Sequence, residues 1–344
     1  MTDTPRITLA QGNGGRLTKE LIDTVFLRHF GQPEGRDGLD ATALPLSPDL
    51  ETVVTTDGFS VEPLEFPGGD IGSLAVHGTV NDLAVCGATP LFLTLGVMIE
   101  EGLPLDQLNR IVASLAMAAR RAGVRIVAGD TKVLPIGHGG GLYLTTTGIG
   151  QRPPSVRMGM GQIETGDVIL VSGPVGDHGI SVMLAREAFE LSGSVRSDSG
   201  SVVPLCLPIA DFDGVRFLRD PTRGGLATVA HEIAQGCGLD LILSEADIPV
   251  RDAVRSVCEI LGYDPYNLAC EGRVVAVVAA EIAERVLSFW QSLPEGAGAA
   301  RIGIVGDAGK AGGREVGGKV CLITALGGQR VLDPLEDDPL PRIC

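Results

Sequence analysis

Glycine stands beside acidic, amide or lysine side chains in six short segments of this chain. The candidate binding and catalytic residues in these segments are Gly12, Asn13, Gly14, Gly15, Asp57, Asn81, Asp82, Asp130, Lys132, Asp220 and Glu271. Glycine loops expose backbone amides that can cradle phosphate oxygens, and carboxylates are ligands that Mg²⁺ prefers. Lysine adds a compact positive charge. Acting together, these segments predict a polyphosphate with Mg²⁺, and hence ATP chemistry.

Each segment taken alone has a simpler interpretation. Asp57 can belong to a turn, Asn81 and Asp82 can be a solvent-facing polar pair on a helix, and Lys132 can form a surface ion pair. Glu271 can be an exposed loop end. No segment matches a Walker loop, a dinucleotide fingerprint or a Ser-His-Asp arrangement. The ATP hypothesis therefore depends on the segments acting together.

The last residue is a cysteine, Cys344, which follows a stretch rich in proline and acidic residues. Proline is excluded from helix interiors and central strands, so we expect residues 332–344 to form an extended, flexible tail. We expect no element around Cys344 in which the thiol could be buried. From residue 333 to its end the tail spans at most about 40 Å. Such a thiol suits a carrier that is loaded at one site and unloaded at another, and a frayed terminus is the alternative.

Composition excludes several classes of partner. The chain has 344 residues, of which 44 % are hydrophobic, enough for two ordinary domains. Its net charge of −16 argues against nucleic acid and against anionic membranes. No apolar run approaches the roughly 20 residues that span a bilayer, and the N-terminus lacks a signal-peptide pattern. The seven cysteines form no CxxC pair, which predicts a reducing cytoplasm and neither disulfides nor a zinc site.

Strands and helices alternate along the chain, so we predict an α+β fold with mixed α/β character. The expected helices are 18–29, 71–85, 105–122, 252–261 and 282–293, with two more that end near 191 and 235. The expected strands are 52–56, 91–99, 124–128, 142–150, 168–171, 239–243, 274–279, 302–305 and 320–324. We place one domain at 1–153, a second at 154–331 and the tail at 332–344. Asp57 and Asp130 are expected where strands end.

With these residues in view, the chain resembles the HypE family, the carbamoyl dehydratases of [NiFe]-hydrogenase maturation. The segments that carry the resemblance are 75–90, 129–133, 173–179, 219–225 and the terminal Pro341-Arg342-Ile343-Cys344, which is the most specific. The other segments are shared more loosely with aminoimidazole ribonucleotide synthetases and selenophosphate synthetases. The resemblance implies a two-domain PurM-like fold. It also implies that N-terminal domains pair in a homodimer and bind ATP near that interface.

The resemblance further implies a role for each candidate residue. Cys344 receives a carboxamide from the carbamoyltransferase HypF, ATP drives the loss of its oxygen to leave a thiocyanate, and the cyano group passes to iron on a HypC–HypD complex. Asp57, Asp82 and Asp220 resemble acids that bind Mg²⁺. Lys132 and Glu271 resemble a pair around the thiocarboxamide, with Glu271 as general base. The remaining assignments are cofactor binding by Asn81 and Asp130 and a flexible phosphate cover formed by Gly12, Asn13, Gly14 and Gly15.

Two other functions are open. A selenophosphate or purine-pathway synthetase would share the scaffold, but the former uses an N-terminal cysteine or selenocysteine, and no cysteine precedes Cys86. A purine enzyme has no need of a terminal thiol. A non-enzymatic adaptor could dock its C-terminal tetrapeptide in a groove that captures carboxylates. Such an adaptor would not need Asp82, Lys132 or Glu271.

Overall fold

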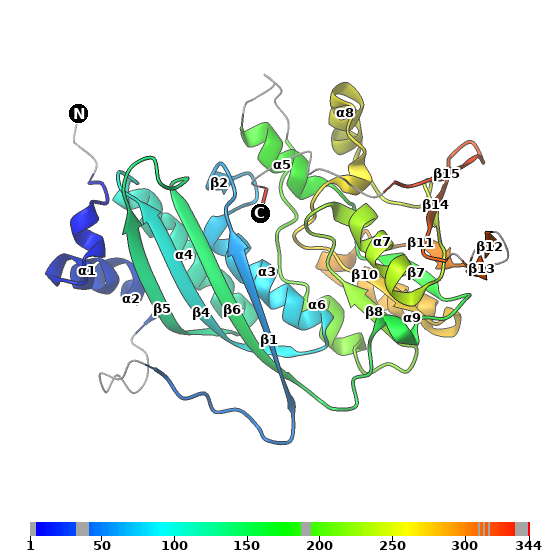
Figure 1. Cartoon of the computed structure of the whole chain (residues 1–344), viewed down its shortest axis with the longest axis horizontal. Coiled ribbons are helices and arrows are strands. Elements are labelled where there is room, and N and C mark those ends of the chain that lie inside the picture. Colours follow the sequence, from blue (N-terminus) through cyan, green and yellow to red (C-terminus); the bar gives the residue numbers. More distant parts are fainter. Residues whose placement is uncertain are drawn as a thin grey trace.

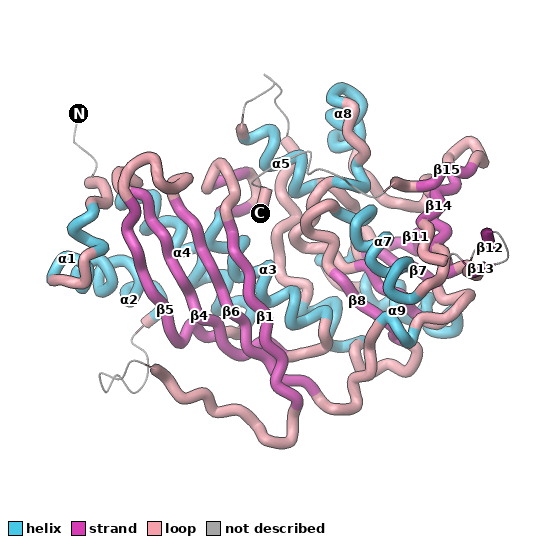
Figure 2. The backbone as a smooth tube through the Cα atoms, viewed as in Figure 1, coloured by secondary structure: helices cyan, strands magenta, loops and turns pink. Residues whose placement is uncertain are grey.

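The computed structural model describes residues 5–31, 41–186, 194–308, 310–311, 314–315, 317–333 and 343–344. Over these residues the chain forms two halves that lie side by side, each built on its own sheet (Figure 1). Helices pack against both sheets (Figure 2). Among the described helices, none is long and apolar enough to cross a membrane.

In the described part of the first half, four strands pair in the order β1-β6-β4-β5. The strands β4 and β5 are parallel, and the other two pairs are antiparallel. Helices α3 and α4 cover one face of this sheet, and α1 and α2 lie beside β5 (Figure 1). The elements are α1 (Arg16–Leu21), a π-helical turn (Ile22–Phe26), α2 (Leu27–Phe30), β1 (Glu51–Phe59), β2 (Glu65–Phe66), β3 (Gly69–Asp70), α3 (Ile71–Val85), β4 (Thr89–Glu100), α4 (Leu105–Ala122), β5 (Arg125–Leu134) and β6 (Leu142–Arg152).

Capping signals fix both long helices of the first half. Asp70 caps α3, because its Oδ1 accepts hydrogen bonds from the amides of Gly72 and Ser73 at 2.8 and 3.0 Å. Helix α4 follows Pro104 and ends at Gly123, whose φ of +72° places it in the left-handed region. Almost all of α3 is buried, because it lies between the sheet and the second half. This position carries Asn81 and Asp82 to the boundary between the halves.

In the second half, the larger sheet has the strand order β15-β14-β9-β11-β7-β10-β8 over the described residues. Its central strands β7 and β10 are buried along their whole length, which explains their uninterrupted Val, Ile, Leu and Ala. The elements are β7 (Val168–Val171), α5 (Asp177–Ala185), α6 (Val203–Cys206), β8 (Val215–Arg219), α7 (Gly225–Cys237), β9 (Leu241–Ser244), α8 (Asp252–Leu261), β10 (Val275–Val278), α9 (Ala280–Gln291), β11 (Ala300–Val305), β12 (Lys310–Ala311), β13 (Arg314–Glu315), β14 (Val320–Ile323) and β15 (Gln329–Val331).

One hydrophobic core runs across the boundary between the halves. It joins Leu74 and Ile99 of the first half to Ile180 and Met183 of α5. Ile343, the residue before the last, belongs to the same cluster and is 3 % exposed. The halves and the end of the chain are therefore packed together by shared apolar contacts.

The α+β fold with mixed α/β character is confirmed. The helices expected at 71–85, 105–122 and 252–261 and the strand at 168–171 have the predicted bounds. The prediction that Asp57 and Asp130 stand at strand ends is wrong, because β1 runs on to Phe59 and β5 to Leu134. The helix expected to end near 191 ends at Ala185, and residues 187–193 lie outside the described residues.

Candidate functional site

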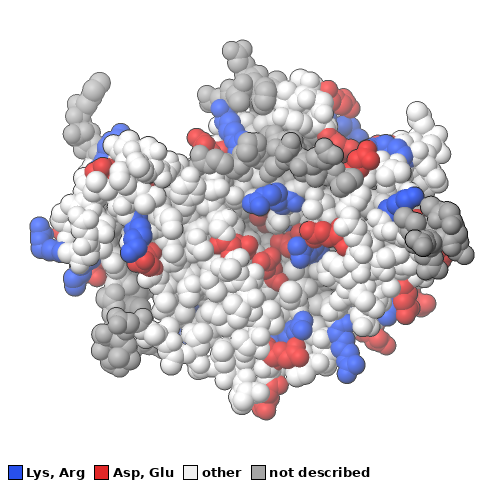
Figure 3. Space-filling view, in the orientation of Figure 1, with Lys and Arg blue, Asp and Glu red and all other residues white. Residues whose placement is uncertain are grey.

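Four acidic side chains predicted from the sequence meet where the two halves face each other. Asp57 comes from β1, Asp82 from α3, Asp220 from the loop after β8, and Glu271 from the segment before β10. They are close enough to influence one another's ionisation. Figure 3 shows acidic side chains gathered in the middle of this face of the molecule. The fold thus brings together residues that are more than 200 positions apart in the sequence.

Burial and the charges of neighbouring acids raise the pKa values of Asp57, Asp220 and Glu271. Burial, with the charge of Asp82, raises the pKa of Asp220 to about 7. The same two causes raise the pKa of Asp57 to about 6, and Arg223 acts in the opposite direction. Glu271 is 2 % exposed, and burial followed by the charges of nearby aspartates raises its pKa well above the usual range. The site is therefore short of positive charge.

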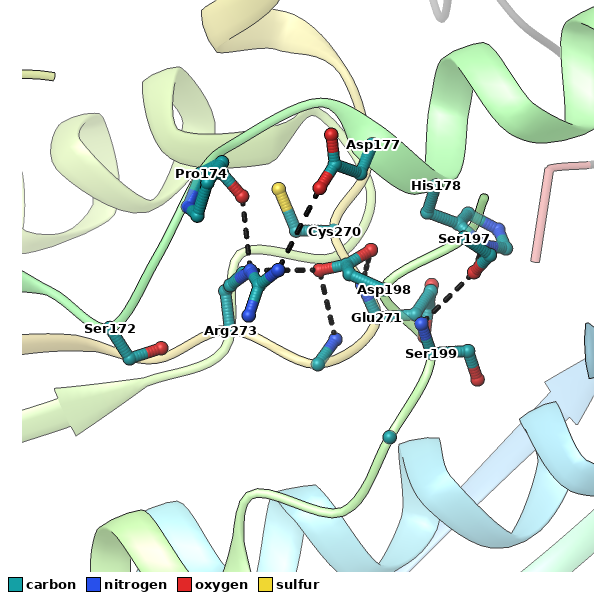
Figure 4. A network of polar contacts seen from close by, with 12 residues as sticks. Ser172, Pro174, Asp177, His178, Ser197, Asp198, Ser199, Cys270, Glu271 and Arg273 are labelled. Carbon is teal, nitrogen blue, oxygen red and sulfur yellow. Dashed lines mark hydrogen bonds and ion pairs between the residues drawn. The ribbon is translucent and has the colours of Figure 1, made fainter. Parts of the chain in front are cut away.

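A network of polar contacts holds Glu271 in place (Figure 4). The backbone amides of Glu271 and Gly272 donate to Asp198 at 3.2 and 3.3 Å. Arg273 pairs with Asp198 at 3.4 Å and with Asp177 at 3.7 Å, and it donates to the carbonyl oxygen of Pro174 at 3.0 Å. The Glu271 Oε1 has no hydrogen-bond partner among the described residues, so this buried oxygen is available to a ligand.

Asn81 joins the two halves. Its Nδ2 donates to the carbonyl oxygens of Gly200 and Glu271 at 3.0 and 3.3 Å. Its Oδ1 accepts from the amide of Val202 at 2.8 Å. These bonds occupy both amide protons and one oxygen lone pair, so the structure gives Asn81 the task of holding the Glu271 segment against α3. Its predicted part in cofactor binding stays a prediction.

The end of the chain lies in this region, contrary to the expectation that Cys344 has nothing to pack against. Cys344 is half-buried and packs against the core shared by the two halves. Its Sγ lies 3.7 Å from Nη2 of Arg223, and its carbonyl oxygen accepts from the amide of Ser60 at 3.3 Å. Of the predicted tail, residues 334–342 lie outside the described residues, so the expectation that they are extended and flexible is not addressed.

A second group of predicted residues lies at the opposite edge of the first sheet. Gly12, Asn13, Gly14, Asp130 and Lys132 line a cavity of about 500 Å³ between β5 and the helical segment of α1 and α2. Apolar side chains from that segment and from β4 form the rest of its wall. The cavity combines a glycine loop, an acid and a base with an apolar surface.

The charged side chains in this cavity are accessible to solvent. Lys132 is exposed and lies 3.5 Å from Asp130. The amide of Gly14 donates to Thr18 Oγ1 at 2.9 Å, and Gly12 packs so closely on Val133 that a Cβ atom there would overlap it. Gly15 precedes α1 and lies outside the lining of the cavity.

Within one chain the predicted pairing of Lys132 with Glu271 is not formed. Strands β1 and β5 are the two edges of the sheet, so about 14 Å separates them at about 4.8 Å per strand spacing. Asp130 and Lys132 are in register with Gly96 and Met98, and Met98 is exposed on the face of β4 opposite the buried Val97 and Ile99. Asp57 faces α3, on the other side of the sheet, where its neighbours are Asp82 and Thr79.

Sequence reasoning missed four residues of the site. Asp198 contributes more to the raised pKa of Glu271 than any other neighbouring charge. Arg223 is the cation beside Cys344, and Thr55 Oγ1 donates to Asp82 at 2.6 Å. His178 contacts the tail. Arg223 and His178 stand in the Gly-rich segments that the sequence singled out, whereas a lone aspartate between serines gives Asp198 no local signal.

The acids fit a Mg²⁺ ion as a partial ligand set. No three described histidine, cysteine, aspartate or glutamate side chains enclose an ion by themselves. Mg²⁺ keeps several waters and takes substrate phosphate oxygens as ligands, so it needs only one or two carboxylates from a protein. Asp82 raises the pKa values of Asp57 and Asp220, so a divalent cation bound by these three carboxylates would offset their mutual repulsion.

Comparison with known proteins identifies the family. The family described as AIR synthase related protein matches with its N-terminal domain at residues 38–151 and its C-terminal domain at 164–314. The carbamoyl dehydratase HypE of Cupriavidus necator is 45 % identical over 98 % of this chain and 95 % of that protein.

Two solved structures resemble the whole chain. A crystal structure of hydrogenase maturation protein HypE in complex with ATP superposes with a TM-score of 0.91 at 44 % identity, covering 98 % of this chain and 99 % of that one. A HypE–HypF complex gives a TM-score of 0.78 at 40 % identity, covering 93 % and 100 %. The fold is therefore PurM-like, as expected, and the chain belongs to the HypE family, the carbamoyl dehydratases of hydrogenase maturation.

Proposed function

We propose that this protein uses ATP to dehydrate a carboxamide carried on Cys344, giving a protein thiocyanate whose cyano group is passed to the iron of a [NiFe]-hydrogenase. The observation that carries the proposal is the position of the thiol. Cys344 Sγ lies beside Arg223, which in turn acts on the carboxylate of Asp57 in the acidic site. A terminal thiol next to a set of buried acids suits a substrate attached to the chain itself.

The reaction needs an activated oxygen, because the oxygen of a carboxamide is a poor leaving group. Transfer of the γ-phosphoryl group of ATP to that oxygen gives ADP and releases one nitrogen proton. Cleavage of the carbon–oxygen bond then releases phosphate, and loss of the second nitrogen proton completes the carbon–nitrogen triple bond. Mg²⁺ held by Asp57, Asp82 and Asp220 would supply charge neutralisation for the phosphoryl group.

Glu271 is the group of this chain that we assign to the nitrogen protons. Burial and the negative charge of the neighbouring aspartates raise the pKa of Glu271 and so favour its protonated form. Glu271 can therefore act as a base only once that negative charge is neutralised. Its unpartnered Oε1 is free to face the carboxamide. Coupling the basicity of Glu271 to an occupied site would keep the unoccupied enzyme from removing protons unproductively.

We propose that Lys132, Asp130 and the segment 12–15 act on ATP at the edge of β5, and that two chains pair through the open face of the first sheet. That face carries Val54 and Met98, which are 61 % and 48 % exposed, and threonines between them. In a chain with a net charge of −16, an almost uncharged face is the one on which a second, equally charged copy can dock. Figure 3 shows few charges there.

The proposed partners are a carbamoyl donor and a cyanide acceptor. A HypE relative has been crystallised with HypF, which supports HypF as the protein that loads Cys344. We propose a HypC–HypD complex as the acceptor, on the chemical ground that cyanide must leave the thiol for iron. The free thiols that the structure describes suit work in a reducing cytoplasm.

The test is the replacement of Cys344 by Ala. We expect C344A to bind ATP normally, measured as the shift in melting temperature on adding ATP, and to lose carbamoyl-dependent ATP hydrolysis. Cys321→Ala, a half-buried thiol on β14, is the matched control and should retain hydrolysis. Mass spectrometry of the wild-type C-terminal peptide should record the gain of a carboxamide and then the loss of water. Persistent carbamoyl-dependent hydrolysis in C344A would refute the proposal.

A further inference from the structure

Two buried imidazoles hold the two described ends of the C-terminal tail. His231 on α7 lies 2.8 Å, through Nε2, from the carbonyl oxygen of Leu332, where the tail begins. His178 in the first turn of α5 lies 2.7 Å, through Nε2, from the carbonyl oxygen of Ile343, where it ends. Figure 1 places the C-terminus beside β2 and α5, between the two halves. The tail is thus anchored at its origin and held again at its tip.

The contact at the tip has a defined tautomer. A carbonyl oxygen can only accept, so His178 Nε2 carries the proton and Nδ1 is the acceptor. The hydroxyl of Ser197 lies 2.8 Å from Nδ1 and supplies that hydrogen bond. The ring of Phe66 stands edge-on to the imidazole at 5.4 Å between centroids. With the tail docked His178 is fully buried, and Ser197 and Phe66 contact its ring on the sides that the tail does not occupy.

The tip makes two further contacts that agree with this arrangement. The side chain of Ile343 is buried in the core shared by the halves. The terminal carbonyl oxygen of Cys344 accepts from the amide of Ser60, at the end of β1. The backbone on both sides of the Cys344 α-carbon is therefore held, and its side chain is left to face Arg223 and the acidic site.

We propose that His178 is a positioning residue, which docks the tail by donating its Nε2 proton to the carbonyl oxygen of Ile343 and so places the Cys344 thiol at the acidic site. That docking serves dehydration rests on the proposed function, whereas the contact between His178 and Ile343 is independent of it. Because His178 binds backbone and not the thiol, the same contact accepts the tail whether the sulfur is free, carboxamidated or cyanated. The origin of the tail at His231 stays fixed while the tip docks and leaves.

The first experiment uses the intact, unloaded protein without ATP or a carbamoyl donor. The rate at which iodoacetamide alkylates Cys344 is followed by mass spectrometry of the C-terminal peptide. His178→Phe keeps a ring against Phe66 and removes the donor, so the rate should rise about two- to tenfold, as expected for the loss of one net hydrogen bond. His178→Gln, which retains a side-chain N–H donor, should restore part of the protection.

Two further variants separate docking from general loosening. His231→Phe removes the equivalent bond at the origin of the tail and should change the rate less than twofold. Ile343→Ala acts on the tail itself, leaves the histidines in place and should also raise the rate, so the proposal stays testable if H178F does not fold. Unchanged alkylation in H178F and I343A, or an equal rise in H231F, would overturn the assignment.

The second experiment adds the carbamoyl donor and ATP. In H178F the amount of carboxamide loaded on Cys344 should match the wild type, while its conversion to thiocyanate should slow in proportion to the loss of docking. Faster alkylation with unchanged conversion would support the contact between His178 and the tail. It would refute the link between docking and dehydration, and with it the proposed site of dehydration. A purely structural defect would reduce loading and conversion together.

Discussion

Glu271 is the acid whose environment differs most from that of a surface carboxylate. It is buried, its neighbours are carboxylates, and one of its oxygens is unpartnered among the described residues. Asp198 accepts a hydrogen bond from its backbone amide, and the charge of Asp198 raises the pKa of Glu271 and so disfavours its ionised form. Such a residue is suited to exchange a proton with a ligand and poorly suited to stabilise the fold.

The prediction for this residue is that Glu271→Gln separates binding from chemistry. The amide preserves size and hydrogen bonding, so ATP binding and loading of Cys344 should be unchanged. Conversion of the carboxamide to thiocyanate should fall by roughly 10²- to 10⁴-fold, the usual contribution of a positioned acid or base. Single-turnover mass spectrometry of the C-terminal peptide measures the step. A rate within tenfold of wild type would show that another group takes the protons.

Asp82 provides the second prediction at this scale. Its Oδ2 accepts from Thr55, and its charge raises the pKa values of Asp57 and Asp220. Asp82→Asn should raise the Mg²⁺ concentration needed for half-maximal ATP hydrolysis at least tenfold. Removing Mg²⁺ with a chelator should abolish hydrolysis in the wild type. Asp106→Asn is a matched control, because Asp106 pairs with Arg110 on the exposed side of α4. An equal change in the Mg²⁺ requirement of both variants would contradict a metal role for Asp82.

At the scale of elements, α3 connects the first sheet to the acidic site. The bounds of α3 could be predicted because most of its residues are apolar or small, and the structure shows that Asp70 caps its first turn. Sequence patterns could not give the length of β5, since Gly129-Asp130 is a usual turn and only pairing with β4 continues the strand. Nor could they place Asp198 or His178, whose roles depend on contacts with residues far away in the sequence.

Helix α3 also carries a histidine that should make stability depend on pH. Burial, with a smaller contribution from Arg121, lowers the pKa of His77 to about 4. The folded state therefore resists protonation of His77. Its free energy of unfolding has its full value above the unfolded pKa of about 6.5 and decreases as the pH falls from 6.5 to 4. At about 1.4 kcal/mol per pKa unit, the difference between 6.5 and about 4 corresponds to a loss of at most about 3 to 4 kcal/mol.

Urea unfolding at several pH values measures this effect. The free energy of unfolding of the wild type minus that of His77→Asn should decrease as the pH falls from 6.5 to 4. The variant can still bond to Ser199, the partner of His77 at 3.1 Å. A flat difference for H77N would contradict the prediction.

At the scale of the whole molecule, the two groups of predicted residues lie on opposite sides of one sheet. The acids and Cys344 lie between the halves, and Lys132 lines the cavity at the free edge. The open face of the sheet runs between them. A dimer formed through that face would bury its apolar side chains and bring a second chain close to the Lys132 cavity.

Pairing through this face predicts that Val54→Glu dissociates the dimer. Two buried like charges without partners should shift the molecular mass in sedimentation equilibrium from two chains to one. Leu326→Glu is the control, because Leu326 is 99 % exposed at the turn between β14 and β15 and lies on the other sheet. A V54E protein that remains dimeric would place the interface elsewhere.

The anchored tail has a consequence for the concentration at which the reaction runs. With its origin held at Leu332, Cys344 is confined to a sphere with a radius of about 40 Å, which corresponds to an effective concentration of several millimolar. The acidic site therefore meets its substrate at this local concentration however dilute the protein is. In the intact dimer, dehydration of the loaded group should be first order and independent of protein concentration. The carboxamide stays attached to the chain until the thiocyanate has formed.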